Sequence, residues 1–187
     1  MSSQQPLVNI PAIFGEVVDR VAAKLKRSVY FDFGKLREVS RRLQQKDGGT
    51  SSKGKKYPLV WLVMNYAENY GDTDEYCELK GITIMICELT ETDLSTADRI
   101  KKTFIPTLYP IYQALIEELG DCGFFDHTGV LDFKHQKIDC PYWNEDMKAG
   151  DKNQFADNID AIQLRDLAMT VNQSTCDRFR LIAEHDF

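Results

Sequence analysis

Histidine and tryptophan are scarce in this chain, and no two cysteines have the Cys-x-x-Cys spacing of metal and redox sites. Its 187 residues include three histidines, two tryptophans and five cysteines. The cysteines are widely spaced, and a chain of this length can bury a core without disulfides. We therefore expect reduced thiols. Cys87 lies inside an apolar run, where a thiol behaves as a small buried hydrophobic group rather than as a nucleophile.

Long apolar runs, targeting signals and phosphate-binding motifs are missing as well. No run reaches the roughly 18 apolar residues of a membrane span, and residues 1–6 lack the basic-then-apolar order of a signal peptide. Neither Gly-x-x-x-x-Gly-Lys-Ser/Thr nor Gly-x-Gly-x-x-Gly occurs. We expect no contact with a membrane, retention in the compartment of synthesis, and no cofactor.

Apolar residues at helical spacing predict two helices near the N-terminus. Asn9 is a suitable N-cap and Pro11 falls in the first turn, so a helix is expected to start there. Its apolar stripe consists of Phe14, Val17, Val18, Val21 and Leu25. Residues 28–33 alternate like a strand, and residues 36–43 then form a basic helical segment. Residues 46–56, rich in glycine, serine and lysine, predict a flexible connector.

Two apolar runs predict central strands. Leu59 to Met64 and Ile82 to Cys87 are apolar on both alternating faces, as in strands that are covered on both sides. The link between them holds the acidic residues Glu68, Asp72, Asp74, Glu75 and Glu78. We predict antiparallel pairing of the two strands and a long, exposed acidic hairpin loop between them.

A helix with two prolines and a bulged strand complete the expected elements. An apolar stripe from Ile100 to Leu119 continues through Pro106 and Pro110, which should kink the helix or split it into two pieces in line. Residues 121–155 are irregular and suggest a hairpin excursion or a lid. Residues 159–171 read as a strand whose apolar face switches between Leu164 and Leu167, which one extra residue in a β-bulge would explain.

These elements predict the fold class. With 43% hydrophobic residues, the chain suits one α+β domain over residues 1–187, with a mainly antiparallel sheet flanked by helices. The long acidic hairpin loop, the connector at 46–56 and the irregular insertion at 121–155 are its less regular parts.

Charge is distributed unevenly along the chain. Residues 1–56 carry 12 Lys and Arg against 5 Asp and Glu, a net +7; residues 57–187 carry 11 against 24, a net −13, which together give −6. Three interpretations remain open. The charges belong to an ordinary solvated surface, they screen each other within one chain, or they direct copies of the chain to pack head to tail.

Four residues have the right chemistry for zinc, but their spacing is not that of a common zinc site. They form Cys-x4-His-x7-His-x4-Cys: Cys122, His127, His135 and Cys140. The alternative is that these are unrelated loop residues.

Clustered carboxylates and basic residues raise two further functional classes. Glu88, Glu91, Asp93 and Asp98 follow the second central strand, and Glu117 and Glu118 lie in the proline-containing helix. A magnesium-dependent nuclease or hydrolase would need such groups to converge in a cleft, although clusters also arise by chance among 29 acidic residues. The basic segment could neutralise nucleic-acid phosphates, but the acidic remainder argues against a dedicated nucleic-acid domain.

Several of these segments together resemble a known family. The runs from Tyr57 to Leu62, from Ile82 to Glu88, from Arg99 to Leu119 and from Asn158 to Ile162 are similar to tail-completion and tail-terminator neck proteins of tailed bacteriophages, particularly of Bacteroidales hosts. The resemblance covers about residues 10–120 and 155–175. It lies in the pattern of strands and helices and leaves residues 121–155 unexplained.

The resemblance implies a virion structural protein in the phage neck or tail, made in the host cytoplasm. Such a protein forms a homo-oligomeric ring, has no active site, contacts portal, neck or tail proteins, and meets passing DNA transiently. The alternative is a nucleic-acid-associated or metal-dependent carboxylate enzyme of phage origin. From charge alone, the predicted contact residues are Arg37, Arg41, Arg42, Lys53, Lys55 and Lys56 on one side and Asp72, Asp74, Glu75 and Glu78 on the other.

Overall fold

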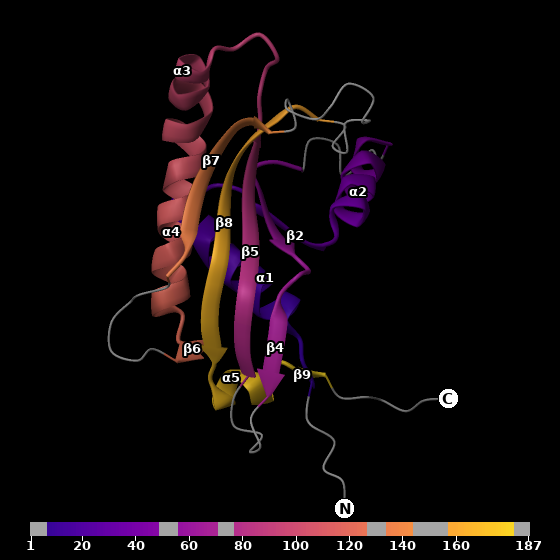
Figure 1. Ribbon diagram of the computed structural model, residues 1–187, viewed down its shortest axis with the longest axis vertical. Helices are drawn as coiled ribbons and strands as arrows, with labels where there is room; N and C mark the ends of the chain where they lie inside the picture. Colours follow the sequence, from indigo (N-terminus) through magenta and orange to yellow (C-terminus); the bar gives the residue numbers. More distant parts are fainter. Residues whose placement is uncertain (1–6, 49–55, 71–76, 127–133, 144–156, 182–187) are drawn as a thin grey trace, which may run out of the picture.

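Two long antiparallel strands, β5 (Cys77–Leu89) and β8 (Ile159–Val171), form the centre of the sheet (Figure 1). The computed structural model describes residues 7–48, 56–70, 77–126, 134–143 and 157–181. Both strands run along the long axis of the molecule, and every other strand of the large sheet is attached to one of them directly or through one neighbour.

The remaining strands extend the sheet on both sides of this pair. β3 (Leu59–Val63) and β4 (Ala67–Tyr70) pair antiparallel with β5, one beyond the other, and β2 (Tyr30–Gly34) pairs parallel with β3. β6 (Phe125–Asp126) and β7 (Gln136–Trp143) pair antiparallel with β8. The predicted α+β class and the antiparallel pairing of the two apolar runs are confirmed. The one parallel pair arises because a helix connects β2 to β3.

The predicted bulge in the last strand is present, and β5 carries a second one that compensates for it. Between Leu164 and Leu167 β8 has one extra residue, and Asp166 adopts a left-handed φ of 59°. Between Leu79 and Ile82 the extra residue is on β5, where Gly81 has φ 71°. The register beyond both bulges is therefore the same as before them. Leu167, Met169 and Val171 of β8 therefore lie in the same core as Ile162 and Leu164.

One face of the sheet is covered by α1 (Ile10–Leu25) and α4 (Tyr109–Asp121), which lie side by side (Figure 1). As predicted, the Asn9 side chain caps α1 by accepting from the Ala12 N–H at 3.2 Å, and Pro11 lies in the first turn. Its stripe is buried against β3, β5 and β8. This face holds the larger hydrophobic core.

The other face holds a smaller core under α2 (Leu36–Gly48). Val39 and Leu43 of this helix pack on Trp61, Met85 and further apolar side chains of the strands. β3 and β5 are thus buried on both faces, as their sequences predict, and Cys87 is fully buried. Burial raises the pKa of the Cys87 thiol, which agrees with the expected hydrophobic role.

The helix with two prolines continues without a break from Thr96 to Asp121. A short turn, α3 (Thr96–Arg99), leads into the π-helical segment η1 (Ile100–Leu108), which passes directly into α4. The prolines therefore do not split the helix, and the segment that contains Pro106 is π-helical instead. The wider π turn makes room for the Pro106 ring, which in an α-helix would clash with the carbonyl four residues earlier.

The second proline, Pro110, removes a backbone N–H donor from the helix, and the Arg27 side chain supplies a donor in its place. Pro110 has no N–H for the Pro106 carbonyl four residues before it, and Arg27, just after α1, donates to that carbonyl from Nη1 at 3.2 Å. Arg27 Nη2 also donates to Thr107 Oγ1 at 3.4 Å. The end of α1 is thereby tied to the junction of η1 and α4.

Three predicted irregular segments are shorter than expected. β4 occupies part of the predicted acidic loop, because residues 67–70 pair with residues 77–80 and leave only 71–76 outside the described residues. α2 extends to Gly48, into the predicted connector, and residues 49–55 are also outside the described part. Within 121–155, β7 is a strand of the main sheet, so the prediction of an irregular insertion is wrong for residues 136–143.

The two ends of the described chain meet at one end of the molecule. β1 (Leu7–Val8) pairs antiparallel with β9 (Arg180–Leu181), which follows the short helix α5 (Gln173–Arg178). The Asn9 N–H donates to the Phe179 carbonyl at 2.8 Å and extends this contact. None of the helices among the described residues has both the length and the apolar character that crossing a membrane requires.

Removing the Arg27 guanidinium should destabilise the fold by about 1 kcal/mol, the usual net value of a hydrogen bond. R27A would be compared with K26A by urea denaturation, since Lys26 is exposed beside it and forms the C-cap of α1 through its backbone. In a P110A background, where the helix regains its own donor, R27A should cost clearly less. An equal cost in both backgrounds would contradict this account of the junction.

Candidate functional site

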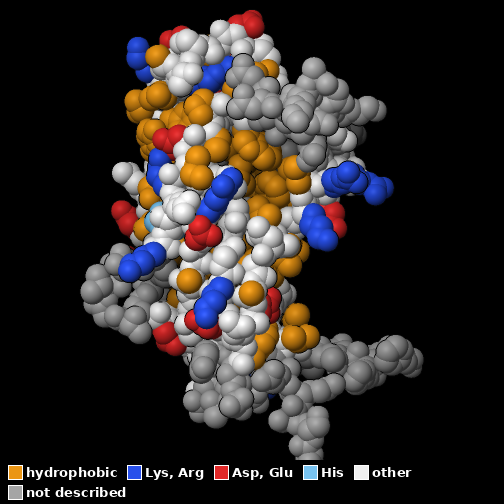
Figure 2. Space-filling view, viewed as in Figure 1, with side chains coloured by type: hydrophobic (Ala, Val, Ile, Leu, Met, Phe, Trp, Pro, Cys, Tyr) orange, Lys and Arg blue, Asp and Glu red, His pale blue; other side chains and the backbone are white. Residues whose placement is uncertain are grey.

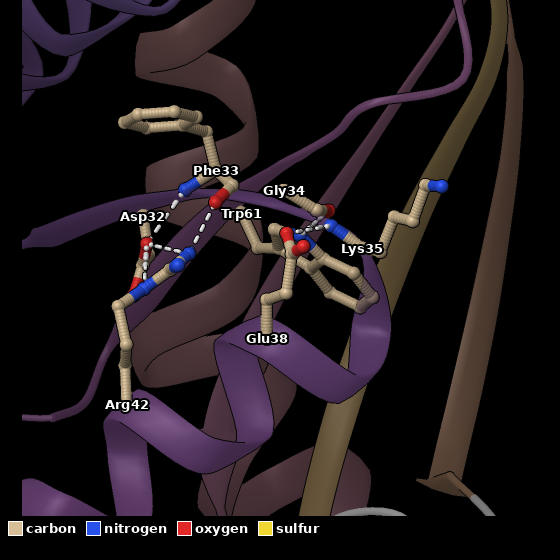
Figure 3. Close-up of polar contacts among 7 residues, drawn as sticks. All are labelled: Asp32, Phe33, Gly34, Lys35, Glu38, Arg42 and Trp61. Atoms are coloured by element: carbon tan, nitrogen blue, oxygen red, sulfur yellow. Dashed lines mark hydrogen bonds and ion pairs between the residues drawn. The ribbon is translucent and has the colours of Figure 1, made fainter.

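The turn from β2 into α2 positions the basic helix on which the sequence places three contact residues (Figure 3). Gly34 has a φ of 126°, and a Cβ there would lie 2.9 Å from Glu38 Oε2, so glycine is required. Its carbonyl accepts from buried Trp61 Nε1 at 2.9 Å. The Lys35 N–H donates to Glu38 Oε2 at 3.3 Å, which is half of a capping box. The start of α2 is therefore fixed on the sheet.

Arg42 is tied to the strand that α2 follows. Its guanidinium donates from Nη2 to Asp32 Oδ1 at 2.6 Å and from Nε to both carboxylate oxygens at 3.0 and 3.2 Å. Nη2 also donates to the Phe33 carbonyl, and the guanidinium lies 5.9 Å from the Phe33 ring. Arg42 is therefore paired within the chain, although its side chain is still 42% exposed, and its place among the intersubunit contacts stays a prediction.

Arg37 and Arg41 remain at the surface of α2. Both are exposed, and Figure 2 shows Lys and Arg side chains at the edge of the molecule where α2 lies in Figure 1. These two keep the accessibility that a contact with a partner needs.

Lys56 is the one lysine of the predicted contact set that lies among the described residues. Lys56 is 6% exposed, and its Nζ lies 3.1 Å from Asp157 Oδ2, which also accepts from the Tyr57 hydroxyl at 3.1 Å. Removing one partner of a buried ion pair strongly lowers the free energy of unfolding. The burial of Lys56 and its pair with Asp157 therefore favour a role in stabilising the fold over one in contacting another subunit. Lys53 and Lys55 lie outside the described residues.

The β4–β5 hairpin holds the described residues of the acidic link, Glu68 and Glu78, at one end of the sheet. Asp72, Asp74 and Glu75 lie outside the described residues, between Tyr70 and Cys77. Glu78 is not in a loop as predicted but in β5, where its carboxylate lies 2.9 Å from Lys80 Nζ. The hydrogen bond from Lys80 lowers the pKa of Glu78. Glu68, exposed on β4, accepts from the Tyr70 hydroxyl at 2.6 Å.

Part of the charge asymmetry is screened within the chain. Lys24 Nζ lies 3.0 Å from Glu117 and 3.1 Å from Glu118, and hydrogen bonds to both raise its pKa. Arg178 of the acidic part pairs with Glu16 of the basic part at 2.6 Å, a pair of the opposite sense that screens none of the asymmetry. Together with Lys56 and Asp157, these pairs join the basic N-terminal part to the acidic remainder. They do not involve Arg37 or Arg41.

The described members of the Cys/His set do not converge. Cys122 is buried and its thiol points to the Leu119 carbonyl at 3.8 Å, Cys140 points to the Ile138 carbonyl at 3.8 Å, and His135 Nε2 lies 3.0 Å from the Tyr112 hydroxyl. His127 lies outside the described residues. Among described residues, no group of three or more His, Cys, Asp or Glu side chains could hold a metal ion.

The sequence analysis missed a buried polar network at the end of the sheet where β5 stops. Arg99 is 3% exposed, and Asp160 of β8 is fully buried. Arg99 Nη1 lies 3.4 Å from Asp160 Oδ1 and donates to Thr90 Oγ1 at 2.8 Å, while Nη2 and Nε donate to the carbonyls of Thr92 and Leu94 at 3.0 and 3.1 Å. The one sequence feature that indicates this network is Asp160, a single charged residue among the apolar residues that begin β8. Arg99 holds the connection from β5 to α3.

A second carboxylate lies on the strand beside this network. Glu88 of β5 pairs in register with Asp160, so two carboxylates lie directly opposite on neighbouring strands. Asp160 Oδ1 accepts from the Tyr142 N–H at 2.7 Å, and Oδ2 has no hydrogen-bond partner among the described residues. Burial raises the pKa of Glu88. The predicted cluster after β5 is therefore split: Glu88 faces inward, whereas Glu91, Asp93 and Asp98 are exposed.

Replacing Arg99 should destabilise the protein strongly, because Asp160 would remain buried without its cation. We expect R99M to lower the free energy of unfolding by about 3–5 kcal/mol. Chemical denaturation would measure this, with R165M as a control. Arg165 is exposed and donates only to Gln163 at 2.8 Å, so its loss should stay within about 0.5 kcal/mol. Equal effects of both substitutions would show that the Arg99 network is not what holds this end.

Stability should depend on pH through Glu88. Because its pKa is higher in the folded protein than in the unfolded chain, the native state holds the extra proton between the two values. Protonation of Glu88 therefore stabilises the folded protein at low pH. This stabilisation is lost as pH rises from 4.5, the ordinary pKa of the carboxyl, through the higher pKa of the folded state. E88Q should be more stable than the natural chain at pH 7, with a smaller difference at pH 4, whereas E91Q, at an exposed site, should show no such trend. Denaturant unfolding curves between pH 4 and pH 7 would measure this. A difference in the free energy of unfolding between E88Q and the natural chain that does not change with pH would contradict the raised pKa of Glu88.

Comparison of the chain with protein-family models and with curated protein sequences finds no match.

Proposed function

We propose that this chain is a structural subunit of a ring in the neck or tail of a tailed phage, and that neighbouring copies contact each other head to tail through unlike charges. The phage assignment rests on the resemblance of the strand and helix segments to neck proteins. The α+β fold with helices on both faces of an antiparallel sheet agrees with what that resemblance implies.

The separation of two charged regions carries the head-to-tail part of this proposal. α2 begins two residues after Gly34, which pairs with Val63, and Val63 in turn pairs with Thr83. From Thr83 to Cys77, where the acidic hairpin begins, β5 runs about 20 Å at its ordinary rise per residue. Figure 1 shows α2 beside one half of the sheet and β4 at the opposite end.

This distance supports the head-to-tail interpretation over screening within one chain. At physiological salt the Debye length is about 8 Å, so Arg37 and Arg41 do not screen charges at the Cys77 end of β5, about 20 Å away. The ion pairs that do form within the chain use other residues. Two unlike patches at different places on one subunit suit a heterologous contact, in which each copy uses one patch as donor and the other as acceptor.

The exposed arginines also fit the alternative of a nucleic-acid-associated protein. Arg37 and Arg41 could contact phosphates, as they would contact carboxylates. The two functions differ in the role of the acidic hairpin, which contributes to copy-to-copy contact but repels DNA.

Charge reversal at either patch should weaken self-assembly, and mixing the two variants should restore it. R37E/R41E makes both patches acidic, and D72K/D74K/E75K makes both basic. We expect each variant alone to assemble on the order of tenfold less at low salt, because like charges oppose each other. In a mixture, every contact can again join unlike charges. Mass photometry and negative-stain images would measure the fraction in closed rings.

A matched control changes the same net charge elsewhere. Lys101 and Lys102 are exposed on η1, away from both patches, so K101E/K102E should assemble normally. A mixture that stays dispersed would rule out the proposed pairing of patches. Tight binding of duplex DNA by the unmixed natural chain, measured by fluorescence anisotropy and lost in R37E/R41E, would favour the nucleic-acid alternative instead.

A further inference from the structure

β2 forms an outer edge of the main sheet, and its backbone alternates between two directions. The Tyr30 N–H donates to the Pro58 carbonyl at 2.8 Å, and the Gly34 carbonyl accepts from the Met64 N–H at 3.4 Å, so the even-numbered residues bond to β3. The backbone groups of Phe31 and Phe33 consequently point away from the sheet. An edge of this kind is a template on which a further strand can pair.

Side chains occupy both outward groups of Phe33 (Figure 3). Its N–H donates to Asp32 Oδ1 at 2.8 Å, and its carbonyl accepts from Arg42 Nη2. Asp32 and Arg42 are joined to each other at 2.6 Å, so a single ion pair serves donor and acceptor together. We call these two residues the clasp. Asp32 is 9% exposed, while the Phe33 ring is 44% exposed beside it.

The other edges of the sheet are protected in different ways. β4 has four residues and β6 has two, which leaves little length for pairing. β7 is longer, but Pro141 removes a donor from it, and a bulge between Cys140 and Trp143 interrupts its register. β2 has neither a proline nor a bulge. Without the clasp, it would present a straight edge with two exposed or half-buried phenylalanines, Phe31 and Phe33.

We propose that the Asp32–Arg42 clasp prevents β2 from pairing with β2 of a second copy of this chain. The occupant that it excludes is a second copy because β2 offers the same apolar and hydrogen-bonding pattern to an identical strand. The clasp restricts contacts between copies to side chains and keeps the sheets of neighbouring subunits separate. This inference does not depend on the proposed ring, since it concerns a contact that the chain avoids.

Removing the clasp should open the edge. We expect R42Q to self-associate at concentrations on the order of tenfold lower than the natural chain, because Phe33 regains a free acceptor. The association should persist at high salt, where contacts through surface charge are screened. K35Q is the matched control, because Lys35 is exposed at the turn after β2, belongs to neither charged patch, and its replacement removes the same charge. Sedimentation velocity in high salt would compare the three proteins.

Hydrogen exchange keeps the proposal testable if R42Q folds poorly. In the natural chain the Phe33 amide should be protected although it lies on an open edge, and D32N should speed its exchange on the order of tenfold. Rapid exchange at Phe33 in the natural chain would overturn the proposal, as would an R42Q variant that stays as dispersed as K35Q in high salt. The charge-reversal variants at Arg37 and Arg41 test the head-to-tail contact, and their results have no bearing on whether the clasp blocks the β2 edge.

Discussion

The antiparallel pairing of β5 with β8 is the constraint on which the other described elements depend. β3 and β4 attach to β5, β6 and β7 attach to β8, and β2 is reached through β3. The paired bulges at Gly81 and Asp166 let both long strands bend while keeping their apolar side chains on the same core. Without that compensation, one residue of slip would turn the apolar face of β8 toward solvent beyond Leu164. The position of α2, and with it the exposed arginines, follows from this register.

The sequence predicted what periodicity determines and missed what distant partners determine. The two apolar runs, the capped first helix and the bulge near Leu164 all leave a pattern of apolar spacing. β7 leaves no continuous apolar run, because Gln136, Lys137 and Asp139 break up its first half and Pro141 interrupts the rest. It is held by β8 and by α4, where Tyr109 donates to Asp139 at 2.9 Å. The π-helical form of η1 depends on room around Pro106 and on Arg27, which lies 79 residues away along the chain.

The candidate contact surface was predicted in part for the same reason. Arg37 and Arg41 are exposed, as their helical positions suggest, but Arg42 and Lys56 are neutralised by Asp32 and Asp157, 10 and 101 residues away. Charge counted along a chain does not show which charges meet in space. What remains after these pairs are subtracted is a basic helix at one end of the sheet and an acidic hairpin at the other, beside an edge strand that is closed by a clasp. That arrangement favours contacts between copies through side chains.

Site-specific crosslinking between copies tests the head-to-tail account most directly. Gln44 is exposed on α2 near Arg41, and Thr73 lies between Asp72 and Asp74, so Q44C and T73C leave every charged residue in place. Under mild oxidation at low salt, a mixture of the two variants should form a disulfide-linked dimer of one Q44C copy with one T73C copy, identified by mass spectrometry of the linked peptides. Each variant alone should form far less dimer. Crosslinks that are absent from the mixture, or equally abundant with either variant alone, would contradict the account.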